Sequence, residues 1–191
     1  ESVVAIGVGV ADRPISWSIV AGSVLGLLVT SVLWWAYFDV SAIQGEHALA
    51  HEPEATRPQL ARNAFTFAHL PLVIGVVLVA LGLKKVLEYV SDGEHHHLTD
   101  PLSAVGAAAL FGGVVLYLLG HVLFKWLTIH QLSVVRLATA GLLLLAWPLT
   151  GSLPALVQLL VVAVVLTAAL GLETVIFAEQ RTRIRAELAH E

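Results

Sequence analysis

Cysteine and methionine are both absent from the 191 residues of this sequence. Without cysteine, these residues can form no disulfide, no thiolate nucleophile and no cysteine-ligated metal or iron–sulfur site. Charge is also scarce, because Asp, Glu, Lys and Arg together make up 13% of the chain, against about 25% in a typical soluble protein. The scarcity of charge excludes an ordinary soluble domain.

Apolar residues are correspondingly abundant: they make up 58% of the chain, and the mean hydropathy is +0.86. They gather into five stretches, each close to the ~20 residues that a helix needs to cross a bilayer. We predict an all-α membrane protein, in which about five transmembrane helices form one polytopic, up-down bundle. The predicted helices cover Trp17–Phe38, Ala64–Leu83, Leu102–Phe124, Leu132–Leu149 and Ala155–Phe177.

The first residues predict that the sequence is a fragment of a longer protein. The chain starts at Glu1 without an initiator methionine, and the apolar run Val3–Val10 is too short to span a membrane. We interpret this run as the end of a truncated helix. The expected partners are therefore the lipid bilayer and a missing N-terminal half of the same chain; a homo-oligomer is left open, and no nucleic-acid partner is expected.

The distribution of Lys and Arg predicts the orientation in the membrane. If the five stretches alternate in direction, seven of the ten basic residues fall on one side and three on the other. Cytoplasmic loops carry the excess of Lys and Arg, so we expect the C-terminus to be cytoplasmic. The seven are Arg57, Arg62, Lys125, Arg136, Arg181, Arg183 and Arg185; the three are Arg13, Lys84 and Lys85.

Two connections are expected to be long. The segment Asp39–Asn63 contains Pro53 and Pro58, which break any single long helix. The segment Lys84–Asp100 lies on the other side of the membrane, and Asp100 followed by proline predicts the N-cap of the third transmembrane helix.

Ionisable residues intrude on the apolar stretches close to one membrane face. They are Asp39, Arg62, His69, His121 and Glu173, which a rise of ~1.5 Å per residue places in or just outside the cytoplasmic third of the bilayer. Charged groups at that depth are costly unless they pair with one another. We predict that His69 and Glu173 face the bundle interior in one polar cluster, with Asp39, Arg62 and His121 as further candidates.

Each of these residues also has a purely structural interpretation. Asp39 and Arg62 can mark helix ends at the lipid headgroups. Glu173 can pair with a C-terminal arginine. His121 can be a neutral ring that is hydrogen-bonded to a backbone carbonyl. Near His69, Pro71 frees a carbonyl one turn earlier and favours a kink. The sequence leaves both interpretations open.

Other motifs predict little chemistry. Adjacent histidines on a loop rarely converge on one metal, so His95–His97 is expected to be exposed and dispensable. No phosphate-binding loop, nucleophile elbow or zinc-protease motif is found. We therefore expect no catalytic residue, no metal and no cofactor, and we do not expect an enzyme.

Five segments of the chain form a recognisable set in their order and spacing: Glu1–Gly7, Leu33–Asp39, Ala61–Pro71, Ala80–Lys85 and Tyr117–His121. Together they resemble the bacterial low temperature requirement protein A family, over nearly the whole chain. The resemblance implies the C-terminal half of such a protein, a bacterial inner-membrane location and an association with growth in the cold. It implies no established chemistry.

Two classes of function remain open at this point. One is a transporter, channel or proton- or ion-coupled permease that uses the polar cluster on the cytoplasmic side. The other is a non-transporting membrane module for assembly or sensing, in which the same residues fix the register of the helices.

Overall fold

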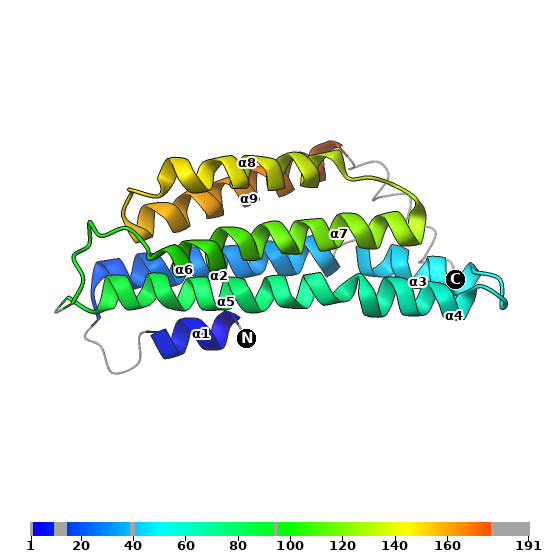
Figure 1. Cartoon of the computed structure of the whole chain (residues 1–191), viewed down its shortest axis with the longest axis horizontal. Coiled ribbons are helices and arrows are strands. Elements are labelled where there is room, and N and C mark those ends of the chain that lie inside the picture. The colour runs from blue at the N-terminus through cyan, green and yellow to red at the C-terminus, as the bar shows by residue number, and fades with distance from the viewer. Residues whose placement is uncertain (1, 10–14, 39–40, 94, 177–191) are drawn as a thin grey trace.

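The computed structural model describes residues 2–9, 15–38, 41–93 and 95–176 (Figure 1). Within these ranges the ordered segments are helices, and no β-strand forms. The long helices lie side by side in an elongated bundle, and successive ones run in opposite directions (Figure 1). The predicted all-α membrane fold is therefore confirmed.

Five helices correspond to the five apolar stretches of the sequence. Four of the helical stretches among the described residues, those that begin at Trp17, Arg57, Ala104 and Ala155, are long and apolar enough to cross a membrane. The fifth, α8, has 17 residues, or ~25 Å of helix, at the short end of the range for a span. The long helices are α2 (Trp17–Phe38), α5 (His69–Ser91), α7 (Gly113–Ile129), α8 (Val134–Thr150) and α9 (Ala155–Ile176).

Shorter helices complete the chain. The α1 helix lies against α5 on the side opposite α8 and α9 (Figure 1). Two π-helical segments, η1 and η2, lead into α5 and α7 respectively. The short elements are α1 (Ser2–Gly9), α3 (Ser41–His51), α4 (Arg57–Arg62), η1 (Asn63–Phe67), α6 (Ala104–Ala107) and η2 (Ala108–Gly112).

The two connections predicted to be long loops are largely helical. The first contains α3 and α4, with Pro53 between them and Pro58 in the first turn of α4, where a missing N–H costs nothing. The second is shortened because α5 continues to Ser91, past the predicted end at Leu83. Glu88 supports this extension by pairing within the helix with Lys85 at 2.6 Å.

Asp100 does not cap the next helix, contrary to the prediction. Helix α6 begins at Ala104, and its cap is Ser103, whose Oγ accepts the Gly106 N–H at 3.2 Å. Asp100 instead accepts the His97 N–H at 2.8 Å, and its backbone carbonyl accepts the Ala155 N–H at 3.0 Å. The loop before α6 is thereby fixed to the start of α9.

Helices α5 and α7 pack with their backbones in contact. A Cβ at Gly75 would lie 2.7 Å from the Tyr117 nitrogen, and one at Gly113 would lie 2.7 Å from the Val79 nitrogen. Gly82 makes a similarly close contact with the Leu110 backbone. Small residues at helix interfaces are the usual means of such close approach in membranes.

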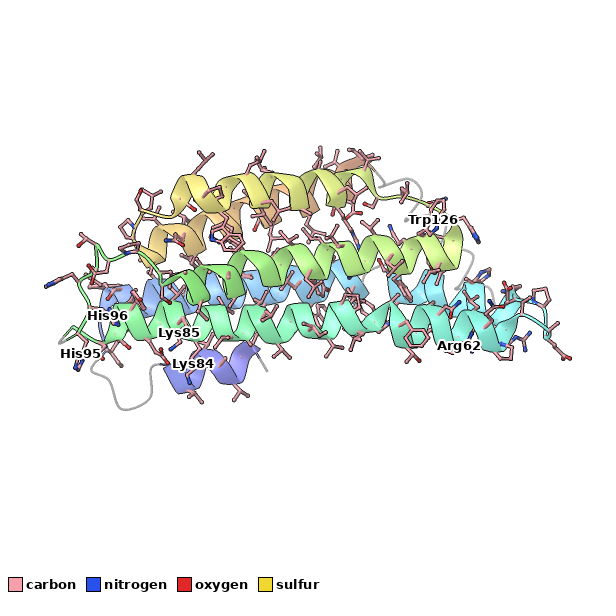
Figure 2. The ribbon with its side chains drawn as sticks, viewed as in Figure 1. Arg62, Lys84, Lys85, His95, His96 and Trp126 are labelled. Atoms are coloured by element: carbon pink, nitrogen blue, oxygen red, sulfur yellow. The ribbon has the colours of Figure 1, made fainter. Side chains whose placement is uncertain are left out.

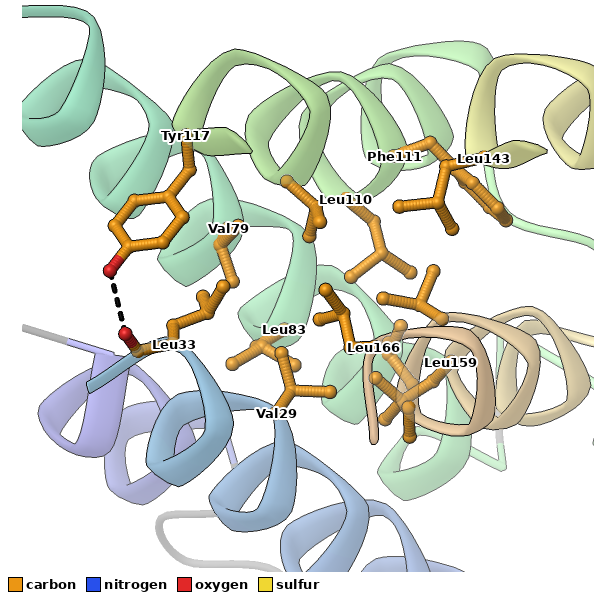
Figure 3. Close-up of a cluster of buried hydrophobic side chains, with 14 of the residues drawn as sticks. Val29, Leu33, Val79, Leu83, Leu110, Phe111, Tyr117, Leu143, Leu159 and Leu166 are labelled. Atoms are coloured by element: carbon orange, nitrogen blue, oxygen red, sulfur yellow. Dashed lines mark hydrogen bonds between the residues drawn. The ribbon is translucent and has the colours of Figure 1, made fainter. Parts of the chain in front are cut away.

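The core lies between α2, α5, α7, α8 and α9, and Figure 3 shows part of it. Its side chains are almost entirely apolar, as expected where no water is available to satisfy polar groups. The hydroxyl of Tyr117 is an exception, and it donates to the carbonyl of Leu33 at 2.6 Å (Figure 3). This bond ties α7 to α2 at mid-bundle.

Candidate functional site

Charged side chains meet at the end of the bundle where α2, α7 and α9 end and α5 and α8 begin, which we call the polar end. Arg136, in the first turn of α8, is 6% exposed. Its Nε donates to both carboxylate oxygens of Glu173, at 3.1 and 3.2 Å. Glu173 lies one turn before the end of α9, so this ion pair joins the last two helices.

The same guanidinium reaches two further helices. Arg136 Nη2 donates to the carbonyl of Ala36 on α2 at 3.1 Å, and Nη1 donates to Nδ1 of His121 on α7. Because a guanidinium can only donate, Nδ1 of His121 must accept, and its proton lies on Nε2. This Nε2 is buried and has no hydrogen-bond partner within the described part of the chain.

Glu173 has additional partners, and the surrounding space is small. Ser133 Oγ donates to its carboxylate at 3.3 Å, and the ammonium of Lys125 lies 4.0 Å away. The cavity that Arg136 and Glu173 line has a volume of about 20 Å³, enough for roughly one water molecule. The ion pair is therefore nearly dry and held by a matched set of donors and acceptors.

His69 belongs to a neighbouring pair at the polar end. Its Nδ1 lies 3.1 Å from the carbonyl of Ala64, and its Nε2 lies 2.7 Å from the hydroxyl of Tyr37. A carbonyl can only accept, so in the neutral ring Nδ1 carries the proton and Nε2 accepts from Tyr37. Ala64 lies in the π-helical segment η1, so the predicted irregularity one turn before Pro71 takes the form of a π-bulge.

Tyr37 lies between the two histidines. Its ring is edge-on to His69 with 5.5 Å between ring centroids, and edge-on to His121 with 5.6 Å. The hydrogen-bonded pair Tyr37–His69 is thus in contact with the Arg136 cluster, although no direct hydrogen bond links the two among the described residues.

An apolar pocket of about 450 Å³ opens beside this pair, between α1, α2 and α5. Tyr37 and His69 lie in its wall, together with Tyr117 and apolar side chains such as Leu33 and Val76. The volume falls within the ~300–1,000 Å³ range of ligand sites.

The structure brings three of the five predicted residues to one place. His121 and Glu173 share Arg136, and His69 reaches His121 through Tyr37. Arg62 is exposed on α4, away from the cluster (Figure 2). Asp39 lies outside the described residues, as do the C-terminal arginines that were considered as partners of Glu173.

Arg136 and Tyr37 were not among the predicted site residues. Arg136 entered the sequence argument through the count of basic residues, although it lies four residues inside the fourth apolar stretch. The depth argument that selected Glu173 would also have selected Arg136. Tyr37 gave no comparable signal, because tyrosines are common at the membrane interface whether or not they bind anything.

The histidine run lies at the opposite end of the bundle (Figure 2). His95 is exposed and hydrogen-bonds to Asp92 at 3.1 Å, whereas His96 is half-buried and stacks on Tyr89 with ring centroids 3.9 Å apart. The prediction of full exposure is therefore wrong for His96. In the described ranges, no three His, Asp or Glu side chains converge as metal ligands.

Comparison with known proteins matches residues 1–170 to the family model described as bacterial low temperature requirement A protein (LtrA). The chain belongs to the LtrA family. This match confirms the resemblance noted in the sequence motifs. It also supports the prediction that the chain is a membrane protein of this family.

One curated relative aligns with most of the chain but with only part of its own length. The chain is 32% identical over 149 residues to an uncharacterized protein, RA0937, of Rhizobium meliloti (strain 1021). The alignment covers 72% of this chain and 33% of the relative, so the chain spans about a third of that protein's length. No solved structure matches the chain.

Proposed function

We propose that this LtrA-family chain is part of an ion-coupled transport protein of the bacterial inner membrane, with Glu173, Arg136 and His121 as the coupling group. One observation carries the proposal: a membrane-buried carboxylate is neutralised by an arginine that also holds two other helices. A carboxylate in such a position can exchange its partner for a proton or a cation.

Exchange at Glu173 would change the packing of the helices. A proton on the carboxylate removes most of its attraction for Arg136, whose guanidinium then depends on His121 and the Ala36 carbonyl. These acceptors lie on α7 and α2. The attraction of α8 for α9 therefore weakens, whereas the attraction of α8 for α7 and α2 is kept. Ion-coupled transport requires two arrangements of the helices that differ in their affinity for the ion.

The pair Tyr37–His69 extends the group towards α5. The Tyr37 hydroxyl bonds His69 at 2.7 Å, and its ring touches His121, whose Nε2–H is unpartnered within the described residues. If the His121 ring rotates away from Arg136, its Nδ1 is free to take up a proton, and the ring can then give its Nε2 proton to the Tyr37 hydroxyl. Tyr37 passes its own proton to Nε2 of His69, which becomes an imidazolium. This arrangement supports protons as the coupling ion.

The alternative is a non-transporting module for assembly or sensing, in which the cluster fixes helix register. The observation that favours it is the small cavity of about 20 Å³, which leaves little room for a moving ion. Under either function we propose a non-enzymatic role, because the sequence contains no recognisable nucleophile or catalytic motif. We also propose a cytoplasmic C-terminus, which follows from the excess of basic residues at the polar end.

Proton flux into liposomes that contain the full-length protein and an internal pH-sensitive dye tests the transport proposal. We expect flux above that of protein-free liposomes, and Glu173→Gln should lower it by about tenfold or more. Glu88→Gln is the matched control, because Glu88 pairs with Lys84 and Lys85 at the surface of the other end. Absence of flux from the unmodified protein would contradict the proposal. Loss of flux that merely follows loss of folded protein would favour the structural alternative.

A further inference from the structure

The pocket beside Tyr37 and His69 has a mostly apolar wall, which also includes the polar side chains of Ser2, Thr30 and Tyr117. The hydroxyls of Thr30 and Tyr117 donate to the backbone carbonyls of Gly26 and Leu33. The volume of the pocket is about 450 Å³, and most of its lining belongs to α2 and α5. The outer rim consists of exposed apolar side chains, among them Trp34, Val73 and Val77. A molecule can therefore enter from the bilayer without crossing a polar surface.

The hydrogen bonds of His69 and Tyr37 determine whether the Tyr37 hydroxyl can act as a donor or as an acceptor towards a ligand. His69 Nδ1 is directed to the Ala64 carbonyl, so Nε2 accepts the proton of the Tyr37 hydroxyl. The Tyr37 oxygen has then used its hydrogen and keeps its lone pairs. It offers an acceptor to the pocket and no donor.

We propose that this pocket binds a long-chain lipid that carries a hydroxyl group, with the chain against the apolar wall and the hydroxyl donating to Tyr37 Oη. The chemistry of the wall selects an apolar chain, and the acceptor on Tyr37 selects a donor at its end. This inference concerns a binding site and does not depend on transport by the chain.

An ordinary acyl chain of a phospholipid fits the pocket less well. It has no donor, so Tyr37 Oη, whose hydrogen is bonded to His69 Nε2, gains no second partner. A hydroxyl-bearing chain adds a hydrogen bond to the remaining lone pair while it fills the same volume. The net gain from one hydrogen bond corresponds to about a five-fold preference for the alcohol.

Photo-crosslinking tests the proposal on the full-length protein in nanodiscs of phosphatidylcholine. The probes are a sixteen-carbon alcohol that carries a diazirine near its tail and the methyl ether of the same molecule, which has no donor. We expect the alcohol to label pocket residues about five-fold more than the ether, with the sites mapped by mass spectrometry to α2 and α5. Tyr37→Phe should bring the ratio to about one, and Val76→Trp, which fills the pocket, should abolish labelling by both probes.

A matched control and a folding check keep the result interpretable. Tyr89→Phe removes a tyrosine hydroxyl at the opposite end of α5, outside the pocket, and should leave the ratio unchanged. Circular dichroism and gel filtration establish that each variant is folded before labelling. Equal labelling by alcohol and ether in the unmodified protein would overturn the proposal, because the pocket would then hold ordinary bilayer chains. Absence of labelling would overturn it too, because another part of the longer protein would then cover the pocket.

Discussion

Arg136 holds the polar end together because one guanidinium serves acceptors on three other helices. Its planar fork reaches Glu173 on α9, His121 on α7 and the Ala36 carbonyl on α2. A lysine at this position would carry its three donors on one nitrogen and could not span acceptors that Arg136 reaches with three separate nitrogens. Removing the arginine would leave the His121 imidazole without its donor and the Glu173 carboxylate without its nearest cation.

Arg136→Met alone should therefore destabilise the protein by about 3–5 kcal/mol, the cost of breaking a buried ion pair from one side. The double variant Arg136→Met/Glu173→Leu should recover part of that loss, because the carboxylate no longer lacks its arginine. Of the charged groups that the structure describes, only the more exposed Lys125, 4.0 Å from Glu173, then loses a partner. Equilibrium unfolding in mixed micelles measures both. Lys84→Met is the control, since its partner Glu88 lies 3.7 Å away at the surface and such pairs contribute ~1 kcal/mol or less. Equal losses in the single and double variants would show that the pair does not hold the helices.

Among the contacts between helices, the one between α5 and α7 leaves no room for a side chain at its glycines. Gly75 and Gly82 on α5 are seven residues apart, as are Gly113 and Gly120 on α7, so each pair lies along one face of its helix. At all four positions an added Cβ would come within 3.0 Å of backbone atoms of the other helix. Neither backbone can move aside without separating the helices.

Gly113→Ala should destabilise the protein by about 1–3 kcal/mol, the usual cost of overpacking. Gly112→Ala, one residue earlier, is the matched control: a Cβ there meets nothing within 4 Å, and alanine is the better helix former. Thermal unfolding in detergent compares the two. A loss for Gly112→Ala as large as that for Gly113→Ala would show that the interhelical contact does not decide the effect.

The sequence predicted the centres of the long helices and missed several of their ends. The centres follow from the bilayer, because an apolar run of this length has no other stable structure there. The ends depend on local contacts, such as the pairing of Glu88 with Lys85 that accompanies the extension of α5 and the Ser103 cap that starts α6. Depth in the membrane indicated His69 and Glu173, with His121 as a further candidate, and it would equally have indicated Arg136. That the arginine joins Glu173 to His121 follows from the packing of α8, which no spacing in the sequence encodes.

The whole molecule has two dissimilar ends. The polar end carries the ion pair, the histidines and the short helices α3 and α4 (Figure 1). At the other end the loop before α6 is joined to the turn before α9 by the Ala155–Asp100 backbone bond and an isolated bridge between Pro101 and Pro154. The two ends therefore face different compartments if the bundle spans the membrane.

Single cysteines introduced into this cysteine-free chain test that orientation. Ser152→Cys, in the turn between α8 and α9, should react with a membrane-impermeant maleimide on intact cells. Ala55→Cys, between α3 and α4, should react only after permeabilisation, because the excess of Lys and Arg predicts that this side is cytoplasmic. Both residues are exposed, so accessibility within the protein is matched. The reverse pattern would overturn the predicted orientation.

The bond between Arg136 and Glu173 also bears on how the last two helices enter the membrane during synthesis. Helix α8 is short and begins with a buried arginine, and an arginine costs up to ~2.5–3.5 kcal/mol when a helix inserts alone. Its counter-charge lies near the end of α9, and four residues separate the two helices. Insertion of α8 and α9 together, as a preformed hairpin with its charges already neutralised, avoids most of that cost. Glycosylation mapping of the isolated hairpin should accordingly show less inserted α8 for Glu173→Ala than for the unmodified segment. In that case α9 assists the insertion of the helix that is synthesised before it.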